Sequence, residues 1–448
     1  MKIKSEIRPQ KVLLYGLGVT GKSVIRFLPR HGWEVYVYTD DGIKVEDLFS
    51  NQTHPERVHP IMKFDQIPWE ALSFVIKAPG ISLDKPLLIE AEKRGMEVLS
   101  DLELAYRLFG GEHLIAITGS NGKTTTTSLI AHLLNQADRL ATACGNIGFP
   151  VLQAFEEASD DGWLVCEASS FQLASVIDFN PFCSAIINIT PDHLEWHGSF
   201  EAYAQCKYQV ASHQTKDHWI FLNPRDKMSR KAEQAGIFSG KVSWIDFSSS
   251  LATELHNKEF WHLYGEHNVE NALFAAAIAE TCALSKEEIY RGLSTFRAIP
   301  HRIETVDEID GIRYINDSKA TNVDSTVRAL ESMDAPVLLI AGGYDKKVPF
   351  SDLFEAFKGR GKALILMGET KYQIKEGAEN AGLADQVHLV ENLSQAVDLA
   401  ETLAKKGDVV LLSPASASWD MYPGYEARGE EFRQLVREIR IKNDRSRG

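Results

Sequence analysis

The sequence is short of the features that mark secreted, membrane-spanning and thiolate-metal proteins. Its five cysteines are scattered without C-x-x-C spacing, a pattern typical of buried free thiols in a reducing compartment. Its apolar runs have the length of strands, whereas a membrane span needs ~20 apolar residues. Residues 1–10 are charged and hold no apolar signal core, so we expect a cytoplasmic protein with no membrane span.

Positive charge is also scarce. The chain has 48 basic and 62 acidic residues and a net charge of −14. This balance argues against nucleic acid or an anionic membrane as the main partner, and it leaves room for a local basic site that binds an anionic substrate. No H-E-x-x-H motif is present, so nothing indicates a zinc hydrolase.

The chain does contain a sustained alternation of strand patterns and helical patterns, which predicts an α/β fold with parallel sheets. Its 448 residues suggest about three domains at ~150 residues each. We predict a Rossmann-like domain at residues 1–100, a central P-loop ATPase-like domain at 101–299 and a second Rossmann-like α/β domain at 300–448. The principal predicted strands are 11–15, 34–38, 74–77, 114–117, 163–166, 185–189, 219–222, 312–315, 337–341, 363–367 and 409–412.

The strongest motif lies between the strand predicted at 114–117 and a helical pattern at 126–135. It reads Gly119-Ser120-Asn121-Gly122-Lys123-Thr124-Thr125. Such a loop binds phosphate, because its backbone amides point at the anion and the helix N-terminus adds partial positive charge. We expect Lys123 to reach the outer phosphates and the Thr124 hydroxyl to bind Mg²⁺. The alternative is a surface turn with a capping threonine.

A second glycine-rich loop follows the first predicted strand and reads Gly16-Leu17-Gly18-Val19-Thr20-Gly21. With Asp40 19 positions after Gly21, it matches the dinucleotide-binding fingerprint, which on its own indicates an NAD-dependent oxidoreductase. In physical terms it indicates only that a pyrophosphate or another anion can lie at this helix start, and a turn that serves packing alone stays open. A second phosphate loop at residue 119 is not expected in a simple dehydrogenase.

Two candidate metal-binding positions follow central strands. Glu167 ends the strand predicted at 163–166, where a carboxylate can hold Mg²⁺ directly or through water, or can be an exposed acid with no such role. The stretch 188–198 is dense in ligand-type side chains, and its Asp192 or His193 could bind a metal or be structural. Lys207 lies in a helical pattern, where a lysine is ordinarily solvated.

Two polar stretches follow strands of the third part. Asn316 to Asn322 follow one strand, and Ser413 to Asp420 follow another. Because ligands bind at the carboxyl ends of strands in open α/β sheets, both stretches are suited to holding carboxylates or phosphates. A helix cap at Asp317 or Ser318 explains the first stretch equally well.

Together these motifs resemble the Mur ligase family of ATP-dependent amide-forming enzymes over essentially the whole chain. The loop at 118–125 is specific to that family, and the stretches 317–322 and 413–418 favour its D-glutamate-adding member. The resemblance also rests on Gly16 to Gly21, Gly145 to Gly148, Glu167 to Leu173, Asn188 to His193, Lys207, Gly265 to Asn268, Asn271, His301 and Arg302.

The resemblance implies a reaction driven by ATP in peptidoglycan synthesis, carried out by a monomer. The alanyl carboxylate of UDP-N-acetylmuramoyl-L-alanine would attack the γ-phosphate to give an acyl phosphate, and the amine of D-glutamate would then displace phosphate. A carboxylate is a poor acyl donor until it carries a good leaving group. Lys123 and Mg²⁺ would offset the repulsion between the two anions.

The resemblance also assigns residues to the ligands, position by position. The UDP substrate would contact Gly18, Val19, Thr20 and Asn146. ATP would contact the loop at 119–125 together with Asn271, Arg302 and Asp317. D-Glutamate would contact Lys319, Thr321, Lys346, Ser418 and Tyr425. The chain departs from the family at Asp40-Asp41, where an arginine is expected, and at Tyr425, where a phenylalanine is expected.

Two Mg²⁺ ions are implied in the same way. Thr124 and Glu167 would bind the first, and His193 would bind the second. Lys207 matches a lysine that is carbamylated in the family, and a carbamate turns a cation into an anionic oxygen donor for a metal. Lys123, His193 and Lys207 are therefore the residues to which the resemblance assigns the chemistry.

Other enzymes and a non-enzyme remain as alternatives. Another amino-acid-adding Mur ligase shares every feature of the fold. The resemblance to a folylpolyglutamate synthase would begin only at the P-loop domain. An NAD-dependent oxidoreductase explains Gly16 to Asp40 and leaves Lys123 and Lys207 without a role. A nucleotide-sensing protein would bind ATP and release no phosphate.

Overall fold

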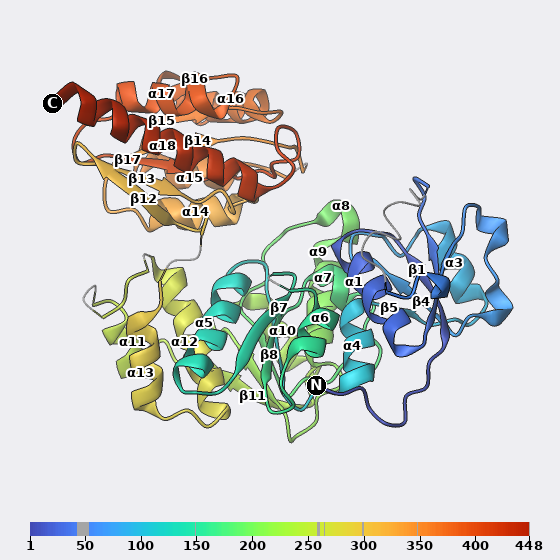
Figure 1. Ribbon diagram of the computed structural model, residues 1–448. Helices are drawn as coiled ribbons and strands as arrows, with labels where there is room; N and C mark the ends of the chain where they lie inside the picture. Colours follow the sequence, from blue (N-terminus) through green and yellow to red (C-terminus); the bar gives the residue numbers. More distant parts are fainter. Residues whose placement is uncertain are drawn as a thin grey trace. The chain divides into compact units, whose positions relative to one another are not determined.

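The computed structural model describes residues 1–42, 53–147, 149–257, 260–263, 265–297, 300–346 and 348–447. Three β-sheets organise this part of the chain (Figure 1). They fall into two compact units, one made of Met1–Ser249 and Asn271–Leu293 and the other of Ser250–Glu270 and Ser294–Gly448. The predicted α/β class with largely parallel sheets is confirmed.

The first sheet is entirely parallel and has the strand order β3-β2-β1-β4-β5. Its strands are β1 (Lys11–Tyr15), β2 (Glu34–Tyr38), β3 (Val58–Pro60), β4 (Phe74–Lys77) and β5 (Val98–Leu99), and its helices are α1 (Val19–Phe27) and α3 (Pro86–Lys93). The order reverses beside β1, so the loop after β1 lies at the switch point where ligands bind in such sheets.

The second sheet is also parallel, with the order β11-β10-β9-β6-β8-β7. Its strands are β6 (Leu114–Thr118), β7 (Ala141–Gly145), β8 (Trp163–Glu167), β9 (Cys183–Ile186), β10 (Trp219–Leu222) and β11 (Lys241–Trp244). The helices of this part of the chain are α4 (Asp101–Phe109), α5 (Lys123–Gln136), α6 (Val151–Glu157), α7 (Ser170–Leu173), α8 (Leu194–His197), α9 (Phe200–Tyr208), α10 (Lys227–Gln234), α12 (Glu266–Thr281) and α13 (Lys286–Thr295). The short helix α11 (Ser250–Glu254) belongs to the second compact unit. The central strand β6 leads into the loop at 119–125 and then into α5, as predicted.

The first and second sheets share one apolar core. Phe27 of α1 and Phe155 of α6 both pack on Phe109 of α4, with ring centres 5.8 and 4.7 Å apart. Core residues of β1, β2 and β6 belong to the same buried cluster. The boundary that we predict near residue 100 therefore divides two sheets within one compact unit, and the three-domain division stays a prediction.

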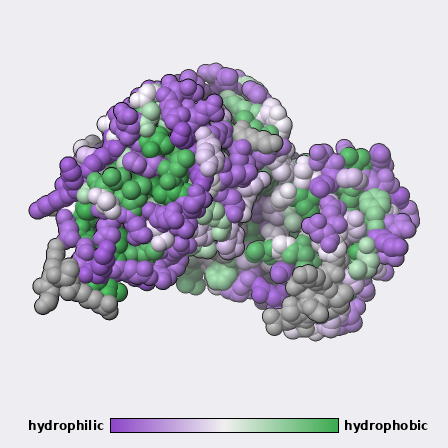
Figure 2. All heavy atoms as spheres, turned by 90° about the horizontal axis from the view of Figure 1, so that it is seen from above, coloured by the Kyte–Doolittle hydropathy of each residue, from purple (hydrophilic) through white to green (hydrophobic). Residues whose placement is uncertain are grey.

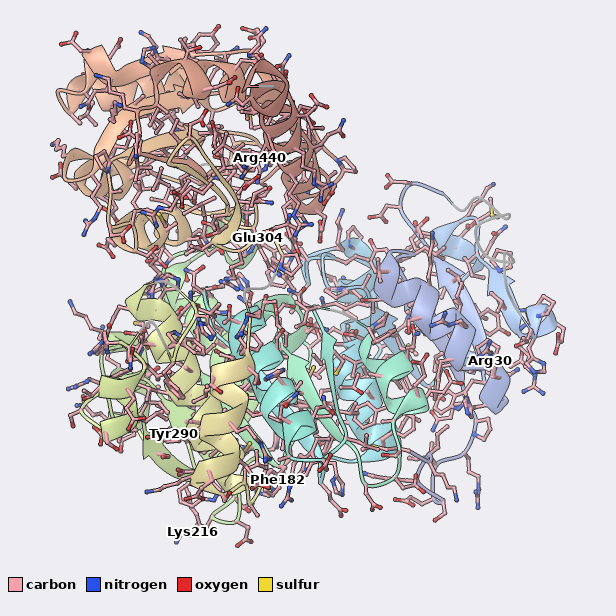
Figure 3. The ribbon with its side chains drawn as sticks, turned by 60° about the vertical axis from the view of Figure 1, so that its left-hand side comes forward. Arg30, Phe182, Lys216, Tyr290, Glu304 and Arg440 are labelled. Atoms are coloured by element: carbon pink, nitrogen blue, oxygen red, sulfur yellow. The ribbon has the colours of Figure 1, made fainter. Side chains whose placement is uncertain are left out.

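The third sheet has the order β12-β13-β17-β14-β15-β16 and is parallel except for the pair β12–β13. Its strands are β12 (Glu304–Ile309), β13 (Ile312–Asn316), β14 (Val337–Ala341), β15 (Gly361–Leu366), β16 (Val387–Leu389) and β17 (Val409–Leu412). The helices α14 (Val323–Glu331), α15 (Ser351–Lys358) and α16 (Lys371–Asn380) bury one face, and α17 (Leu393–Leu403) and α18 (Tyr425–Arg447) the other. Arg440 of α18 donates to Asp307 of β12 at 2.9 Å, near Glu304 of the same strand (Figure 3).

Five predicted strands differ in their bounds from the observed β6, β8, β9, β13 and β15, and the difference is largest at β9. The apolar run at 185–189 predicted a strand there, and β9 instead ends at Ile186. The backbone beyond it turns to the phosphate loop, because Ile187 N donates to Thr118 O at 3.0 Å and Asn188 O accepts from Ser120 N at 2.9 Å. Hydropathy marks these residues as buried and does not reveal that, after the bond to Thr118 at the end of β6, the backbone bonds to the loop.

The surface agrees with the composition. Hydrophilic residues dominate the face seen in Figure 2, with apolar side chains gathered in patches among them. Among the described residues, no helix is long and apolar enough to cross a bilayer. All five cysteines are free, and all but Cys206 are buried, as expected.

Candidate active site

Two lysines converge on one carbonyl of the phosphate loop. Lys123 begins α5, and its Nζ donates to Gly119 O and Ser120 O, each at 2.8 Å. Lys207 comes from α9, 88 residues further from Gly119, and its Nζ donates to the same Gly119 O at 2.7 Å. Two ammonium groups at one loop create a strongly positive site, which is suited to a polyphosphate.

Lys207 is buried rather than solvated. Its side chain is 1 % exposed, and its ammonium stands 4.5 Å from the centre of the Tyr203 ring. Burial, followed by the nearby charge of Lys123, holds the pKa of Lys207 well below its ordinary value. A lysine buried against a phosphate-binding loop is unusual, because burial of an ammonium group costs free energy. Such lysines are more common at functional sites.

A carboxylate and a hydroxyl meet beside this loop. Thr124 Oγ1 donates to Glu167 Oε2 at 2.8 Å, and Asn146 Nδ2 donates to Glu167 Oε1 at 2.9 Å. Glu167 ends β8, so its side chain reaches the edge of the sheet where the phosphate loop begins. A hydroxyl paired with a carboxylate at a phosphate loop supplies oxygen ligands of the kind that Mg²⁺ takes. The predicted pairing of Thr124 with Glu167 is geometrically sound, while Gly148 lies outside the described residues.

Asn271 closes over the same loop from α12. Its Oδ1 accepts from Thr126 Oγ1 at 3.3 Å, and its side chain is buried. Gly122 has φ +85°, and a Cβ there would collide with Asn271 Oδ1. The buried Thr125 Oγ1 at the start of α5 has no hydrogen-bond partner within the described chain. An unsatisfied hydroxyl at a helix N-terminus fits the place of a bound phosphate.

His193 sits in a strained backbone conformation. Its φ is +51°, in the left-handed region, which few non-glycine residues adopt. Its ring lies 4.8 Å from the Phe171 ring, and its Nε2 is 3.6 Å from Asp192 Oδ2. His197 stacks on Phe171 at 5.6 Å, and burial together with Lys207 lowers the pKa of His197 to about 4.

The first glycine-rich loop has open space for a ligand. In contrast with the loop at 119–125, no lysine ammonium is seen to donate to its carbonyls among the described residues. A Cβ at Gly21 would collide with Gly16 O, so the third glycine serves helix–strand packing. Gly18 faces open space, and Val19 beside it is 76 % exposed. Asp40 accepts from Tyr15 Oη at 2.7 Å and pairs with Lys85 at 3.2 Å. The loop can therefore admit a ligand close to its backbone.

In the second unit, Asp317 is buried at the carboxyl end of β13. Ser413 Oγ donates to its Oδ2 at 2.7 Å and Ile303 N to its Oδ1 at 3.2 Å. Burial raises the pKa of Asp317 to about 7, against the opposing effects of Ser413 and Arg302. The two polar stretches predicted from the sequence thus meet here, because β13 and β17 are neighbours in the sheet.

The residues predicted for the amino-acid pocket lie at the same edge of the third sheet. Lys319 Nζ stands 5.1 Å from the centre of the Tyr425 ring. Ser418 is buried after β17, while Thr321 and Lys346 are half-buried. Lys319 and Tyr425 are therefore adjacent in the structure, as a common pocket requires.

Comparison with known proteins follows the same division of the chain. Residues 10–100 match the MurD-like N-terminal domain of Mur ligases, residues 117–279 the Mur ligase middle domain, and residues 301–416 the glutamate ligase domain. The UDP-N-acetylmuramoylalanine–D-glutamate ligase of Clostridioides difficile is 37% identical, over 97% of this chain and 100% of that one. The chain belongs to the Mur ligase family. The enzyme of the same name from Caldanaerobacter subterraneus is also 37% identical over 97% of this Mur ligase and all of its own length.

Solved structures of other Mur ligases share the fold. The MurF ligase of Thermotoga maritima in complex with ADP superposes with a TM-score of 0.61 at 15% identity, covering 97% of this chain and 96% of that one. The UDP-N-acetylmuramate-alanine ligase of the same organism gives 0.57 at 18% identity, covering 96% and 99%. At such identities the likeness concerns the fold alone.

Two contacts within this Mur ligase's site were not assigned from the sequence, although Asn188 begins the stretch 188–198 that the sequence singled out. Asn188 clamps the phosphate loop, since its Oδ1 accepts from Asn121 N at 2.9 Å. Arg428 is buried in α18 and donates to Ser318 O at 2.8 Å and to Ser416 O at 3.3 Å, so it joins the two polar stretches. Their positions after a central strand and in a helix facing the sheet gave no chemical signal on their own.

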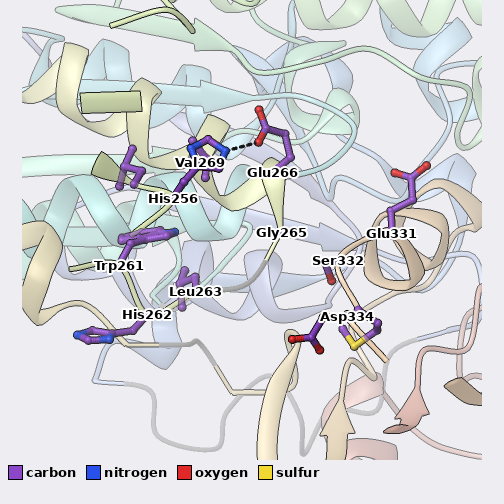
Figure 4. Close-up of a pocket in the computed structure, with 12 residues that line it drawn as sticks. His256, Trp261, His262, Leu263, Gly265, Glu266, Val269, Glu331, Ser332 and Asp334 are labelled. Carbon is purple, nitrogen blue, oxygen red and sulfur yellow. Dashed lines mark hydrogen bonds and ion pairs between the residues drawn. The ribbon is translucent and has the colours of Figure 1, made fainter. Parts of the chain in front are cut away.

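A separate cavity of about 440 Å³ lies in the second unit (Figure 4). It is lined by the segment 255–269 and the end of α14, where His256 Nε2 contacts Glu266 at 2.9 Å. None of the residues predicted for the active site is among its lining residues. Across the described chain, no group of three or more His, Cys, Asp or Glu side chains is arranged to hold a metal. A Mg²⁺ bound by one carboxylate, one hydroxyl, phosphate and water needs no such group.

Proposed function

We propose that this Mur ligase joins D-glutamate to UDP-N-acetylmuramoyl-L-alanine at the expense of ATP, in cytoplasmic synthesis of the peptidoglycan precursor. The observation that carries the ligase chemistry is the convergence of Lys123 and Lys207 on Gly119 beside the Thr124–Glu167 pair. The choice of D-glutamate is supported by the names of full-length relatives at 37% identity. Both products and substrates are small molecules, and we propose that the enzyme acts as a monomer.

ATP would bind with its phosphates on the loop at 119–125. The helix start, the unsatisfied Thr125 hydroxyl and Lys123 all suit an anion there. By the resemblance, Asn271, Arg302 and Asp317 would also contact the nucleotide. Lys123 would move from the loop carbonyls to the γ-phosphate and stabilise charge on the transferring phosphoryl group.

Mg²⁺ would supply charge neutralisation at the transferring phosphate. Thr124 and Glu167 would hold the first ion, with Asn146 orienting the Glu167 carboxylate. His193 and a carbamylated Lys207 would hold the second. The burial of Lys207 at the loop supports this role, since an ordinary solvated lysine has no reason to lie there.

The two remaining substrates would each have their own set of residues. The UDP part would lie on the first glycine-rich loop, against Gly18, Val19 and Thr20, where open space meets the helix start. Asn146 would contact the same substrate. D-Glutamate would be held in the second unit by Lys319, Thr321, Lys346, Ser418 and Tyr425, whose two lysines suit its two carboxylates. In this scheme residues 1–100, 101–299 and 300–448 serve the UDP substrate, ATP and the amino acid.

The test is phosphate release from ATP and Mg²⁺ with UDP-N-acetylmuramoyl-L-alanine and one amino acid at a time. We expect release that depends on D-glutamate and does not occur with L-glutamate or L-lysine. Release with another amino acid would keep the ligase and change the substrate. No release, from folded protein that binds ATP, would favour a nucleotide-sensing role. Steady absorbance at 340 nm with NADH and keto acids serves as the control against a dehydrogenase.

The acyl phosphate has a test of its own. With ¹⁸O in the alanyl carboxylate, one labelled oxygen should appear in the released phosphate, because that oxygen forms the bond to phosphorus and leaves with it. Mass spectrometry of the phosphate measures this transfer. Unlabelled phosphate would mean that ATP is cleaved by water and would remove the acyl phosphate from the scheme.

A further inference from the structure

Lys77 is a buried lysine that the proposed chemistry does not use. It ends β4, and its side chain is fully buried. Its Nζ donates to Pro79 O at 3.2 Å and to Phe171 O at 3.3 Å, and it stands 5.5 Å from the centre of the Trp196 ring. Within the described chain no carboxylate lies within 4.0 Å of it. An ammonium in the interior that makes no ion-pair contact costs free energy that an apolar side chain would not.

The contacts of Lys77 join segments that belong to different sheets. Lys77 and Pro79 belong to the first sheet, whereas Phe171 lies in α7 and Trp196 in α8, both of the second. Helix α7 is a single turn, and the carbonyl of its Phe171 accepts from Lys77 at 3.3 Å. A second bond runs the same way, since Trp196 Nε1 donates to Gly80 O at 3.3 Å.

The hydrogen bonds of Lys77 and Trp196 join two segments, and each segment borders a proposed ligand site. On the first sheet, a Cβ at Gly16 would stand 2.9 Å from Ala78 Cβ, so the turn at 78–80 lies directly against the first glycine-rich loop. On the second sheet, the Phe171 ring lies 4.8 Å from the ring of His193. Lys77 therefore stands between the loop for the UDP part and the segment for the reacting carboxylate.

We propose that Lys77 is a positioning residue that fixes the spacing between the UDP-binding loop and the His193 segment, so that one substrate can reach both. The inference rests on the proposed function, because it requires a substrate that spans the two sheets. Lys77 touches neither ATP nor the reacting atoms in this scheme. Replacement of Lys77 would leave the UDP-binding loop and the His193 segment intact. It would remove the gain in affinity that comes from binding both ends of one substrate at once.

The ammonium is also expected to titrate in a useful range. Burial lowers the pKa of Lys77 to about 8, with Asp101 of α4 and Cys206 of α9 opposing that shift. His197 of α8 also faces it, and its own pKa is lowered to about 4, so His197 is neutral near pH 8. Since the charged form makes both carbonyl contacts, the connection is complete below pH 8 and is lost as the pH rises through that value.

The experiment is calorimetric titration of wild type and Lys77→Met with UDP and with UDP-N-acetylmuramoyl-L-alanine. The exposed Lys93→Met at the end of α3 serves as the matched control. We expect Lys77→Met to bind the complete substrate about tenfold more weakly and UDP with unchanged affinity. In wild type the affinity for the complete substrate should fall between pH 7 and 9, and in Lys77→Met that dependence should disappear. A residue that only supports the fold would not abolish the pH dependence.

Two results would overturn the inference. The first is that Lys77→Met binds the complete substrate as tightly as wild type does. The second is that Lys77→Met loses as much affinity for UDP as for the complete substrate, because Lys77 would then act only at the UDP site. Trp196→Phe, which keeps the ring and removes the bond to Gly80, should reproduce the pattern at smaller size, and urea unfolding checks that both variants are folded. If wild type binds no UDP-substrate at all, the proposed function fails first and the inference with it.

Discussion

The two glycine-rich loops of this chain share a local design and differ in charge. Each follows a central parallel strand, β1 or β6, and opens a helix, α1 or α5. Each is followed by a lysine, Lys22 or Lys123. Lys22 is exposed, whereas Lys123 lies on the loop carbonyls and is joined there by the buried Lys207.

The difference shows that a strand–loop–helix turn specifies anion binding and leaves the chemistry to its neighbours. The first loop offers backbone amides and open space at Gly18, which suit the diphosphate that we propose to bind there. The second adds the cation of Lys123, the buried Lys207 and the Thr124–Glu167 pair, a set that suits the proposed transfer of a phosphoryl group. Binding and turnover should therefore respond separately to mutation at the two loops.

The largest expected effect is that of Lys123→Ala. It should lower the rate of phosphate release by on the order of 10³-fold, because the group that stabilises the transferring phosphoryl is lost. Lys22→Ala, at the matching position of the other loop, should change the rate less than about fivefold, as for an exposed charge. Steady-state phosphate release measures both. Similar losses in the two variants would break the comparison.

Lys207→Ala should lower turnover by on the order of 100-fold, since it removes the proposed carbamate that binds the second Mg²⁺. Short carboxylic acids added to the assay should restore part of the activity by supplying the missing oxygen ligand. Lys216→Ala, at an exposed site in the same unit (Figure 3), is the control and should behave as wild type. Full activity of Lys207→Ala without any added acid would remove Lys207 from the site.

Glu167→Gln keeps the shape of the side chain and removes its charge. The Mg²⁺ concentration that gives half-maximal phosphate release should rise about 10- to 100-fold. Glu112→Gln, an exposed position before β6, should leave the Mg²⁺ titration unchanged. An unchanged titration for Glu167→Gln would mean that the first Mg²⁺ is held elsewhere.

The smallest expected effects distinguish two glycines of the first loop. Gly21→Ala should destabilise the fold by about 1–3 kcal/mol, because its Cβ meets the Gly16 carbonyl. Gly18→Ala should leave stability unchanged, since nothing lies within 4 Å of its Cβ position. Urea unfolding of the two variants measures both values. A destabilised Gly18→Ala would show that this space belongs to packing rather than to a ligand.

Much of the fold could be predicted from the sequence, because long buried strands are continuous apolar runs. The bounds of β1, β2, β4, β10, β14 and β17 agree with the prediction. The short edge strands β3, β5 and β16 were not predicted, because two or three residues carry no periodicity. The common core of the first two sheets was not foreseen either, since Phe27, Phe109 and Phe155 are brought together only by the fold.

The site divides in the same manner. The phosphate loop is local in sequence, so its place between β6 and α5 could be predicted, while its contacts with ATP stay a prediction. Lys207, Lys77 and Arg428 have no such local signal, because a single charged residue in a helix or at a strand end is normally solvated. Only the packed structure shows that all three are buried and where their charges are held.

The most direct test of the division between the loops is calorimetric titration of Gly18→Ala and Lys123→Ala with two ligands. The ligands are UDP-N-acetylmuramoyl-L-alanine and a non-hydrolysable ATP analogue with Mg²⁺. Gly18→Ala should lose affinity only for the UDP substrate, and Lys123→Ala only for the ATP analogue. If both variants lost affinity for the same ligand, the account would be contradicted, because the two loops would then form a single nucleotide site.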